Sequence, residues 1–214
     1  MAHYDTDADV FDRVWPGGYV ETFEGYVNVG CAKYREGHIA AVLGKFFNRQ
    51  HTCLEIGPGG GLWTRKYLIP NFRQVIALDV VSQKFGGKLK YIRVPNRDFS
   101  CHGVDDGSID FLFSFGCFCH LSVEAQSEYL RSAYRKMRDG AFGLVMFANF
   151  DRHPNWNKMS AEERRAHEGN RNPEGAVWFY NDLATTRKMI EEAGFRGFYD
   201  CMPDFRDTLA AFQK

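Results

Sequence analysis

A glycine-rich turn between two short apolar runs is the feature that most constrains the fold of this chain. The first run, Thr52–Ile56, leads directly into Gly57-Pro-Gly-Gly-Gly61. The second run, Val75–Leu78, ends at Asp79. A helix-length segment separates the two runs, so the order is strand, glycine turn, helix, strand and acid. This order is typical of an open α/β sheet that binds a nucleoside at the carboxyl ends of its strands.

Each residue type in this pattern has a physical reason for its position. Gly57, Gly59 and Gly61 lack a Cβ, so the backbone can turn tightly and approach a ligand. Backbone N–H groups at the start of the next helix then face that ligand. Asp79 ends its strand where a carboxylate can accept hydrogen bonds from two ribose hydroxyls. A dinucleotide site needs a glycine at the sixth position from Gly57, and the chain has Leu62 there, which disfavours a pyrophosphate.

The acidic residue before the turn narrows the ligand class further, because Glu55 is unfavourable beside a diphosphate and suits a cation. The segment Glu55-Ile-Gly-Pro-Gly-Gly-Gly61 resembles motif I of the class I S-adenosylmethionine-dependent methyltransferases, Glu/Asp-x-Gly-x-Gly-x-Gly. A downstream Asp98-Phe99 adds to this resemblance, which extends from about Gln50 to Lys214. It implies S-adenosylmethionine as the cofactor, S-adenosylhomocysteine as the product, and no metal.

The resemblance also implies roles for the residues around the cofactor. Glu55 would order the glycine turn or lie near the methionine ammonium, and Asp79 would hold the ribose. Asp98 would accept a hydrogen bond from the adenine amine, and Phe99 would offer its backbone N–H to a ring nitrogen. A turn aspartate followed by a core phenylalanine is the competing explanation. The cofactor-binding residues are expected to be Glu55, Gly57, Gly59, Gly61, Asp79, Val80, Asp98, Phe99 and Phe115.

Residues after the fourth and fifth strands are expected to face the same site. His120, in Phe115-Gly-Cys-Phe-Cys-His120, is a candidate general base because an imidazole titrates near neutral pH. His153, in a polar segment after the fifth strand, is the second candidate. The competing explanations are a histidine that only shapes the pocket and a solvated surface loop. Cys117, Cys119 and His120 lack the second cysteine pair of a zinc-finger site, so no metal is expected.

Candidate acceptor-binding residues come from the less regular parts of the chain. Arg152 can hold an anionic group through two parallel hydrogen bonds. Aromatic rings can cover the acceptor or the sulfonium, although local packing also explains each ring. The predicted substrate-binding residues are Tyr19, Tyr26, Arg152, Trp178 and Tyr180.

Composition limits the possible partners. Lys+Arg and Asp+Glu number 27 each, for a formal net charge of zero, whereas nucleic-acid-binding proteins usually carry a basic excess. No apolar run reaches membrane-spanning length, and the acidic N-terminus does not resemble a signal peptide. The six cysteines are scattered, as expected of reduced thiols in the cytoplasm. We therefore expect a cytoplasmic monomer or homodimer that binds a small-molecule acceptor and neither nucleic acid nor membrane.

Alternation of strand-like and helix-like segments predicts an α/β fold with a doubly wound, mostly parallel seven-stranded sheet. Residues 1–48 are expected to cap the substrate site, and residues 49–214 to form the cofactor-binding domain with an insertion loop at 150–180. The predicted strands are Thr52–Ile56, Gln74–Leu78, Leu89–Val94, Ile109–Phe115, Phe142–Ala148, Gly197–Cys201 and Thr208–Phe212. The predicted helices are Gly37–Phe47, Leu62–Leu68, Val123–Met137 and Asn181–Ala193.

Three functions are compatible with these features. The favoured one is O-methylation of a hydroxyl on a sugar or natural product, and the others are N-methylation of a small amine and cofactor binding without catalysis. Methylation of DNA bases is disfavoured, because the Asn/Asp-Pro-Pro-Tyr/Phe motif of those enzymes is replaced by Ser114-Phe-Gly-Cys-Phe118. The paired acidic loop of protein-arginine methyltransferases is absent as well. Leu62 argues against a nicotinamide oxidoreductase.

Overall fold

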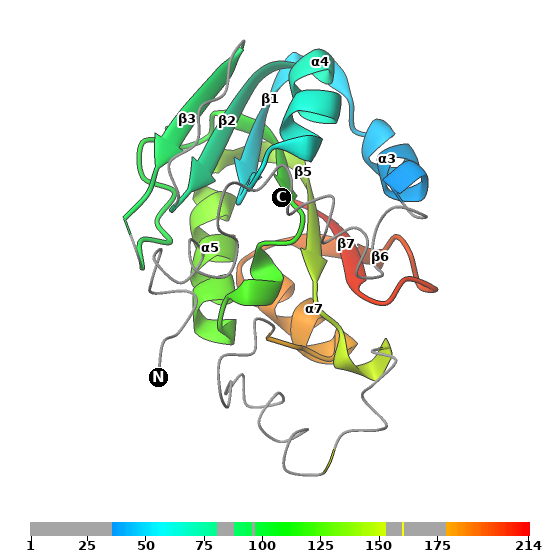
Figure 1. The fold of residues 1–214 in the computed structure, drawn as a ribbon. Helices are drawn as coiled ribbons and strands as arrows, with labels where there is room; N and C mark the ends of the chain where they lie inside the picture. The colour runs from blue at the N-terminus through cyan, green and yellow to red at the C-terminus, as the bar shows by residue number, and fades with distance from the viewer. Residues whose placement is uncertain (1–35, 81–87, 96, 153–159, 161–178) are drawn as a thin grey trace.

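A computed structural model describes residues 36–80, 88–95, 97–152, 160 and 179–214 (Figure 1). Within this part of the chain, seven strands form one sheet in the order β3-β2-β1-β4-β5-β7-β6. The strands are β1 Asn48–Ile56, β2 Phe72–Asp79, β3 Leu89–Arg93, β4 Ile109–Ser114, β5 Met137–Phe147, β6 Arg196–Asp200 and β7 Thr208–Gln213.

The direction of the strands confirms the predicted, mostly parallel sheet. Strands β1 to β5 pair in parallel, and β7 pairs antiparallel with both β5 and β6. The strand order reverses at β1, which lies between β2 and β4. In an open α/β sheet, ligands bind beyond the carboxyl ends of the strands at such a reversal.

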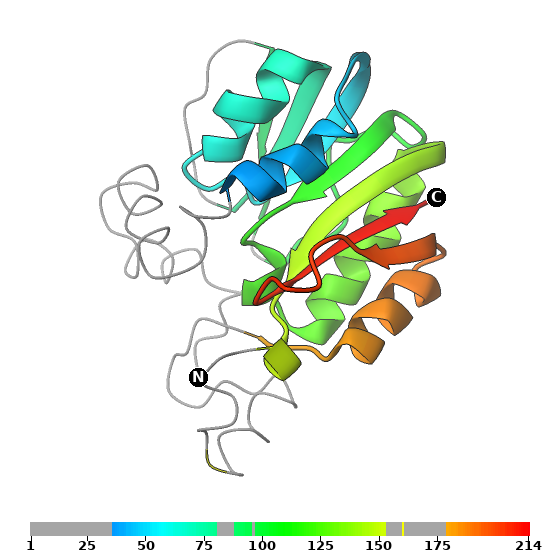
Figure 2. The same cartoon turned by 90° about the vertical axis from the view of Figure 1, so that its right-hand side faces the viewer.

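Helices cover both faces of the sheet (Figure 2). One face packs against α5 and α7 through residues such as Leu130 and Ile190, and the other packs against α3 and the helical residues 62–71 through Leu43 and Trp63. The helical elements are α3 Glu36–Gly44, η2 Thr64–Leu68, α4 Ile69–Asn71, η3 Phe118–His120, α5 Val123–Lys136, η4 Phe150–Arg152 and α7 Leu183–Glu192.

Polar side chains cap the two longest helices. The Ser122 hydroxyl accepts a hydrogen bond from the Ala125 N–H at the start of α5. Asp182 caps α7, and its carboxylate accepts from the Thr185 N–H. These bonds satisfy backbone donors that the first turn of a helix leaves without a partner.

The end of one predicted helix and the start of the fifth predicted strand were wrong. The helix expected to stop at Leu68 continues to Asn71. Pro70 lies in its last turn, where the missing N–H removes one hydrogen bond but does not break the helix. The fifth strand begins at Met137, not Phe142. Its pairing with β4 shifts register over this stretch, and Gly140 takes a left-handed φ of 81°, so Asp139-Gly140, a pair typical of turns, forms an irregularity within the strand.

The first strand also begins earlier than its apolar pattern indicates. Strand β1 starts at Asn48, and its first four residues are exposed or half-buried while its last five are buried. A run of apolar residues marks only the part of a strand that lies in the core. Among the described residues, no helix combines the length and hydropathy that crossing a bilayer requires.

The two ends of the predicted insertion lie side by side. Asn149 and Asn181 form a parallel β-bridge, and the Phe150 N–H donates to the Asn181 carbonyl at 3.3 Å. The chain therefore leaves the end of β5 and returns to the same place before α7. The N-terminal cap stays a prediction, because only its last part, from Glu36, lies among the described residues.

Candidate active site

The glycine turn is tied to the end of β2 by two hydrogen bonds. The Gly57 N–H donates to the Leu78 carbonyl at 2.8 Å, and the Gly59 N–H donates to Oδ2 of Asp79 at 3.1 Å. Gly59 and Gly61 have φ values of 51° and 77°, in the left-handed region where a glycine is favoured. The turn and the predicted ribose acid are therefore in direct contact, and the carboxylate is buried at the carboxyl end of its strand.

Gly57 has a second reason to lack a side chain. Its φ is 70°, and a Cβ built there would lie 2.4 Å from Cβ and 2.5 Å from Sγ of Cys117. Real carbon atoms do not approach that closely. The backbone at Gly57 therefore approaches the loop after β4, whereas the sequence predicted only an approach to a ligand.

Glu55 lies buried beneath the turn, with 2% of its surface exposed. The Thr64 hydroxyl donates to its Oε2 at 2.7 Å. Burial raises the pKa of Glu55 to about 8; the Thr64 hydrogen bond opposes this shift, and the nearby charge of Asp79 adds to it. At neutral pH this carboxyl therefore holds its proton, and a cation bound beside it would favour the ionised form.

Replacement of Glu55 by glutamine is expected to change how stability depends on pH. The folded-state pKa lies above the unfolded value of 4.5, so the wild type loses stability as pH rises from about 5 through about 8. Each unit of this shift corresponds to about 1.4 kcal/mol. Glu55→Gln should remove that loss, so its free energy of unfolding should rise relative to wild type across this window. Urea unfolding at several pH values measures the difference.

The exposed Glu128 on α5 provides the matched control, because Glu128→Gln removes a carboxyl from the same chain without touching the site. A constant difference between Glu55→Gln and wild type from pH 5 to pH 8 would contradict the raised pKa.

The third cofactor segment follows β3. Asp98 Oδ1 accepts hydrogen bonds from the Ser100 N–H at 2.9 Å and from the Ser100 hydroxyl. The Phe99 ring packs edge-on against Tyr129, with ring centroids 5.0 Å apart. The side chains thus adopt the competing arrangement of a turn aspartate and a core phenylalanine, and the adenine contacts stay a prediction. Val80, at the end of β2, is half-buried against the same core.

Two further aspartates, Asp105 and Asp106, lie at the turn before β4. The Asp105 carbonyl accepts a hydrogen bond from the Ser108 hydroxyl at 2.7 Å. Asp106 forms an exposed ion pair with Lys136, also at 2.7 Å. In the described structure, neither carboxylate is hydrogen-bonded to the glycine turn.

The loop after β4 brings His120 to the ligand edge of the sheet. His120 ends the short helix η3, is only 5% exposed, and donates its backbone N–H to the Cys117 carbonyl at 2.8 Å. Burial raises the pKa of the Cys117 and Cys119 thiols far above their ordinary value, so both remain protonated. Within the described residues, no three His, Cys, Asp or Glu side chains are placed to hold a metal ion.

Trp63, which follows the glycine turn, was not among the predicted site residues. Its ring packs against Phe115, with centroids 5.1 Å apart, and Phe115 directly follows β4. The indole Nε1 is buried and finds no hydrogen-bond partner in the described structure. A buried donor without a partner is unusual in folded proteins. The sequence alone does not indicate that the indole N–H of this tryptophan is buried without a partner.

The segment before α7 crosses the same edge of the sheet. The Phe179 N–H donates to the Cys119 carbonyl at 2.7 Å, and the Asn181 N–H donates to the Ala148 carbonyl at 2.9 Å. Tyr180, a predicted substrate residue, is buried between these two anchors. It also lines a pocket of about 280 Å³ together with the first residues of α5 and α7. The structure therefore places Tyr180 next to the turn that carries His120.

Arg152, a predicted substrate-binding residue, forms an ion pair with an edge strand of the sheet. Its Nη2 lies 2.6 Å from Oδ2 of Asp200 on β6, and both side chains are largely buried. This ion pair anchors η4 to the far edge of the sheet. Nη1 of the same guanidinium is buried and has no hydrogen-bond partner among the described residues, so binding of an anionic acceptor there stays a prediction. The remaining candidates, His153, Tyr19, Tyr26 and Trp178, lie outside the described residues.

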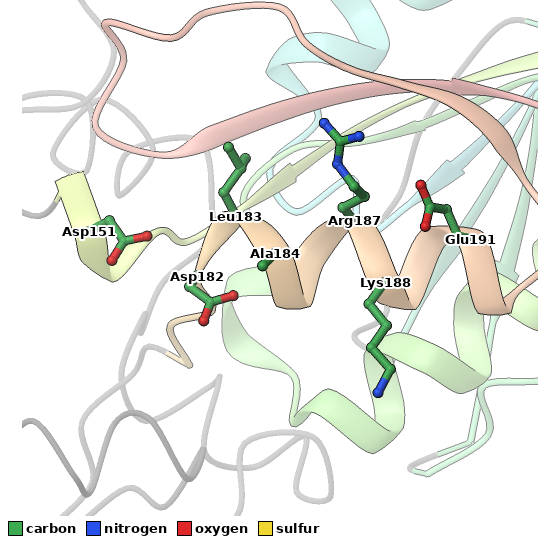
Figure 3. Close-up of a pocket in the computed structure, with 7 residues that line it drawn as sticks. All are labelled: Asp151, Asp182, Leu183, Ala184, Arg187, Lys188 and Glu191. Atoms are coloured by element: carbon green, nitrogen blue, oxygen red, sulfur yellow. The ribbon is translucent and has the colours of Figure 1, made fainter.

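A separate groove of about 550 Å³ runs along α7 and contains none of the predicted site residues (Figure 3). Its charges are mixed, with Arg187 and Lys188 beside Glu191. Arg187 lies over the Phe198 ring at 4.8 Å, and Lys188 pairs with Glu192 at 3.7 Å. Both cationic side chains already have partners on the protein surface, so we do not consider the groove a candidate for the reaction site.

A methyltransferase-domain family matches residues 31–198 of this chain. Among solved structures, the chain is similar to the 1,6-didemethyltoxoflavin-N1-methyltransferase of Burkholderia thailandensis, solved with 1,6-didemethyltoxoflavin and S-adenosylhomocysteine bound. The identity is 14% and the TM-score 0.63, over 100% of this chain and 91% of that chain. A search of curated protein sequences found no match.

Similar folds occur in two further solved structures. One is an S-adenosylmethionine-dependent methyltransferase from Mesorhizobium loti, with 13% identity and a TM-score of 0.59 over 82% of this chain and 96% of that one. The other is a S-adenosylmethionine-dependent methyltransferase from Methanosarcina mazei, with 15% identity and a TM-score of 0.56 over 80% and 94%. At these identities the likeness establishes the fold.

Proposed function

Since the chain belongs to the methyltransferase-domain family, we propose that it transfers the methyl group of S-adenosylmethionine to a hydroxyl of a small-molecule acceptor, a sugar or a natural product. The contact between the Gly59 N–H and Asp79 is the observation that carries the cofactor half of this proposal. It joins the glycine turn to a buried carboxylate where the strand order reverses. Asp79 would hold the ribose hydroxyls, and the turn would leave room for the sugar.

Glu55, buried beneath the glycine turn, is also compatible with S-adenosylmethionine. The ligand carries a sulfonium and an ammonium, and the buried carboxyl of Glu55 gains its charge most readily beside a cation. When bound, S-adenosylmethionine supplies a methyl group that is already activated by the sulfonium. The protein's main task is then to align the acceptor, and positioning can contribute roughly 7–11 kcal/mol.

His120 is the proposed general base. It is buried at the carboxyl end of β4, beside the loop that packs on the glycine turn. Its imidazole would accept the proton of the acceptor hydroxyl as the oxygen–carbon bond forms and the carbon–sulfur bond breaks, and would release that proton to solvent afterwards. Such proton transfer contributes about 10²–10⁴-fold in rate.

His120→Ala is expected to lower kcat for a hydroxyl acceptor by about 10²–10⁴-fold and to leave the affinity for S-adenosylhomocysteine unchanged. Methyl transfer from labelled S-adenosylmethionine to a panel of sugars, phenols and amines measures the first quantity, and calorimetry measures the second. His51→Gln is the matched control, because His51 lies near the amino end of β1, at the opposite edge of the sheet.

N-methylation is the second candidate. It is supported by the structural similarity, over the whole chain, to an N1-methyltransferase. An amine loses its proton before it attacks, so full turnover of an amine by His120→Ala would support this candidate over the first. Binding of S-adenosylmethionine without transfer to any acceptor in the panel would support a non-catalytic role.

A further inference from the structure

A single buried side chain holds both ends of the turn that carries His120. Gln126, in the first turns of α5, has no exposed surface. Its Nε2 donates to the Phe118 carbonyl at 2.9 Å and to the Leu121 carbonyl at 2.8 Å. These two carbonyls flank Cys119 and His120, so the amide fixes the start and the end of η3.

The remaining atom of this amide reaches a second segment of the site. Oε1 of Gln126 accepts a hydrogen bond from Nδ2 of Asn181 at 2.7 Å, and Asn181 is itself buried. The backbone of Asn181 is bonded to Ala148 at the end of β5. Through this contact Gln126 also fixes the segment that contains Tyr180.

The arrangement uses each donor and acceptor of the glutamine amide, whose two N–H groups and carbonyl oxygen all have partners. Such a network is strongly directional, because each partner must keep its place for the others to remain satisfied. Helix η3 is a 3₁₀ turn of three residues, and 3₁₀ hydrogen bonds have poorer geometry than those of an α-helix. The two bonds from the glutamine therefore reinforce the turn's own bonds from the His120 and Leu121 N–H groups.

We propose that Gln126 and Asn181 are a pair of positioning residues, which hold His120 and Tyr180 in one fixed relation at the acceptor side of the site. The inference rests on the proposed function for its catalytic consequence. Both residues act through the two segments that they join, so loss of either should disturb the alignment of the acceptor and leave the glycine turn and Asp79 unaffected.

The pair is tested with Gln126→Met, which keeps the length of the side chain but removes the amide, and with Asn181→Ala. Hydrogen–deuterium exchange is measured on peptides covering residues 117–121 and 179–182. Each variant should exchange faster in both segments, because the lost bond opens both. The kcat for the acceptor should fall by about 10²-fold, the effect that a small misplacement produces, with affinity for S-adenosylhomocysteine unchanged.

Ser132→Ala is the matched control. Ser132 is a buried polar residue on the same helix, where it accepts a hydrogen bond from Arg135 and makes no contact with η3. It should leave exchange in both segments and the kcat unchanged. The double variant Gln126→Met/Asn181→Ala should lose no more activity than the stronger single variant, since residues that act as one unit are not additive.

Faster exchange in residues 117–121 with no change in 179–182 for Gln126→Met would overturn the inference, because the Gln126–Asn181 bond would then add nothing to the direct bond from the Phe179 N–H to the Cys119 carbonyl. The exchange experiment needs no acceptor, so it tests the coupling between the two segments even if the wild type transfers no methyl group to the panel. Absence of methyl transfer by the wild type would count against the proposed function alone. If Gln126→Met does not fold, Asn181→Ala tests the same bond from its other end.

Discussion

Asp79→Ala is expected to weaken binding of S-adenosylhomocysteine by on the order of 100-fold or more. A hydrogen bond to a charged group contributes about 1.5–3 kcal/mol, and the carboxylate would make two of them to the ribose. The variant also deprives the Gly59 N–H of its acceptor, which lies 3.1 Å away in the wild type. Loss of that bond loosens the glycine turn, so both halves of the cofactor site are affected by one substitution.

Calorimetric titration of wild type, Asp79→Ala and Asp79→Asn with S-adenosylhomocysteine measures this effect. Asp79→Asn keeps one acceptor oxygen but loses the charge, so its affinity should lie between the other two. Asp105→Ala removes an acid from an exposed turn and is the control. Unchanged affinity in a folded Asp79→Ala protein, or binding of NAD⁺ in its place, would remove this acid from the proposed site.

Gly57→Ala is expected to lower the free energy of unfolding by about 2–5 kcal/mol. A left-handed φ of 70° costs a residue with a Cβ about 1–2 kcal/mol. The overlap with Cys117 adds a further 1–3 kcal/mol or so, which is typical of overpacking. The neighbour cannot rotate away, because the nearest atom is its Cβ, which moves only with the backbone.

Gly107→Ala separates the two contributions. Gly107 has a similar φ of 64°, but a Cβ there would meet no atom within 4 Å. It should therefore show only the conformational cost. Adding Cys117→Gly to Gly57→Ala should restore part of the lost stability, since it removes both atoms that overlap. Equal losses in Gly57→Ala and Gly107→Ala, measured by urea unfolding, would show that the contact with Cys117 has no energetic weight.

The strand and helix order could be predicted because it depends on neighbouring residues. The apolar runs that end at Ile56 and Leu78 and the glycines between them each act through local backbone geometry. Where the prediction was wrong, the local signal was incomplete. The exposed first half of β1 has no apolar pattern, and Asp139-Gly140 has the sequence of a turn although it lies within β5.

Side-chain partners were the least predictable part of the site. Arg152 is a plausible anion-binding residue from its sequence, yet in the structure it pairs with Asp200 on an edge strand. Gln126 has no feature that separates it from any other polar residue of an amphipathic helix. Its role follows only from its bonds to two loop carbonyls and to Asn181, which lies in a different part of the chain.

The sequence by itself thus determined the order of strands and helices, the glycine turn and the acid that ends β2, because hydrophobic periodicity and the conformational freedom of glycine are local properties. Only the tertiary structure decided that Gly57 makes room for Cys117, that Glu55 is buried enough to hold a proton at neutral pH, and that Gln126 joins the two acceptor segments. These contacts link segments far apart in the chain. They depend on the spatial order and register of the strands, which no local pattern encodes.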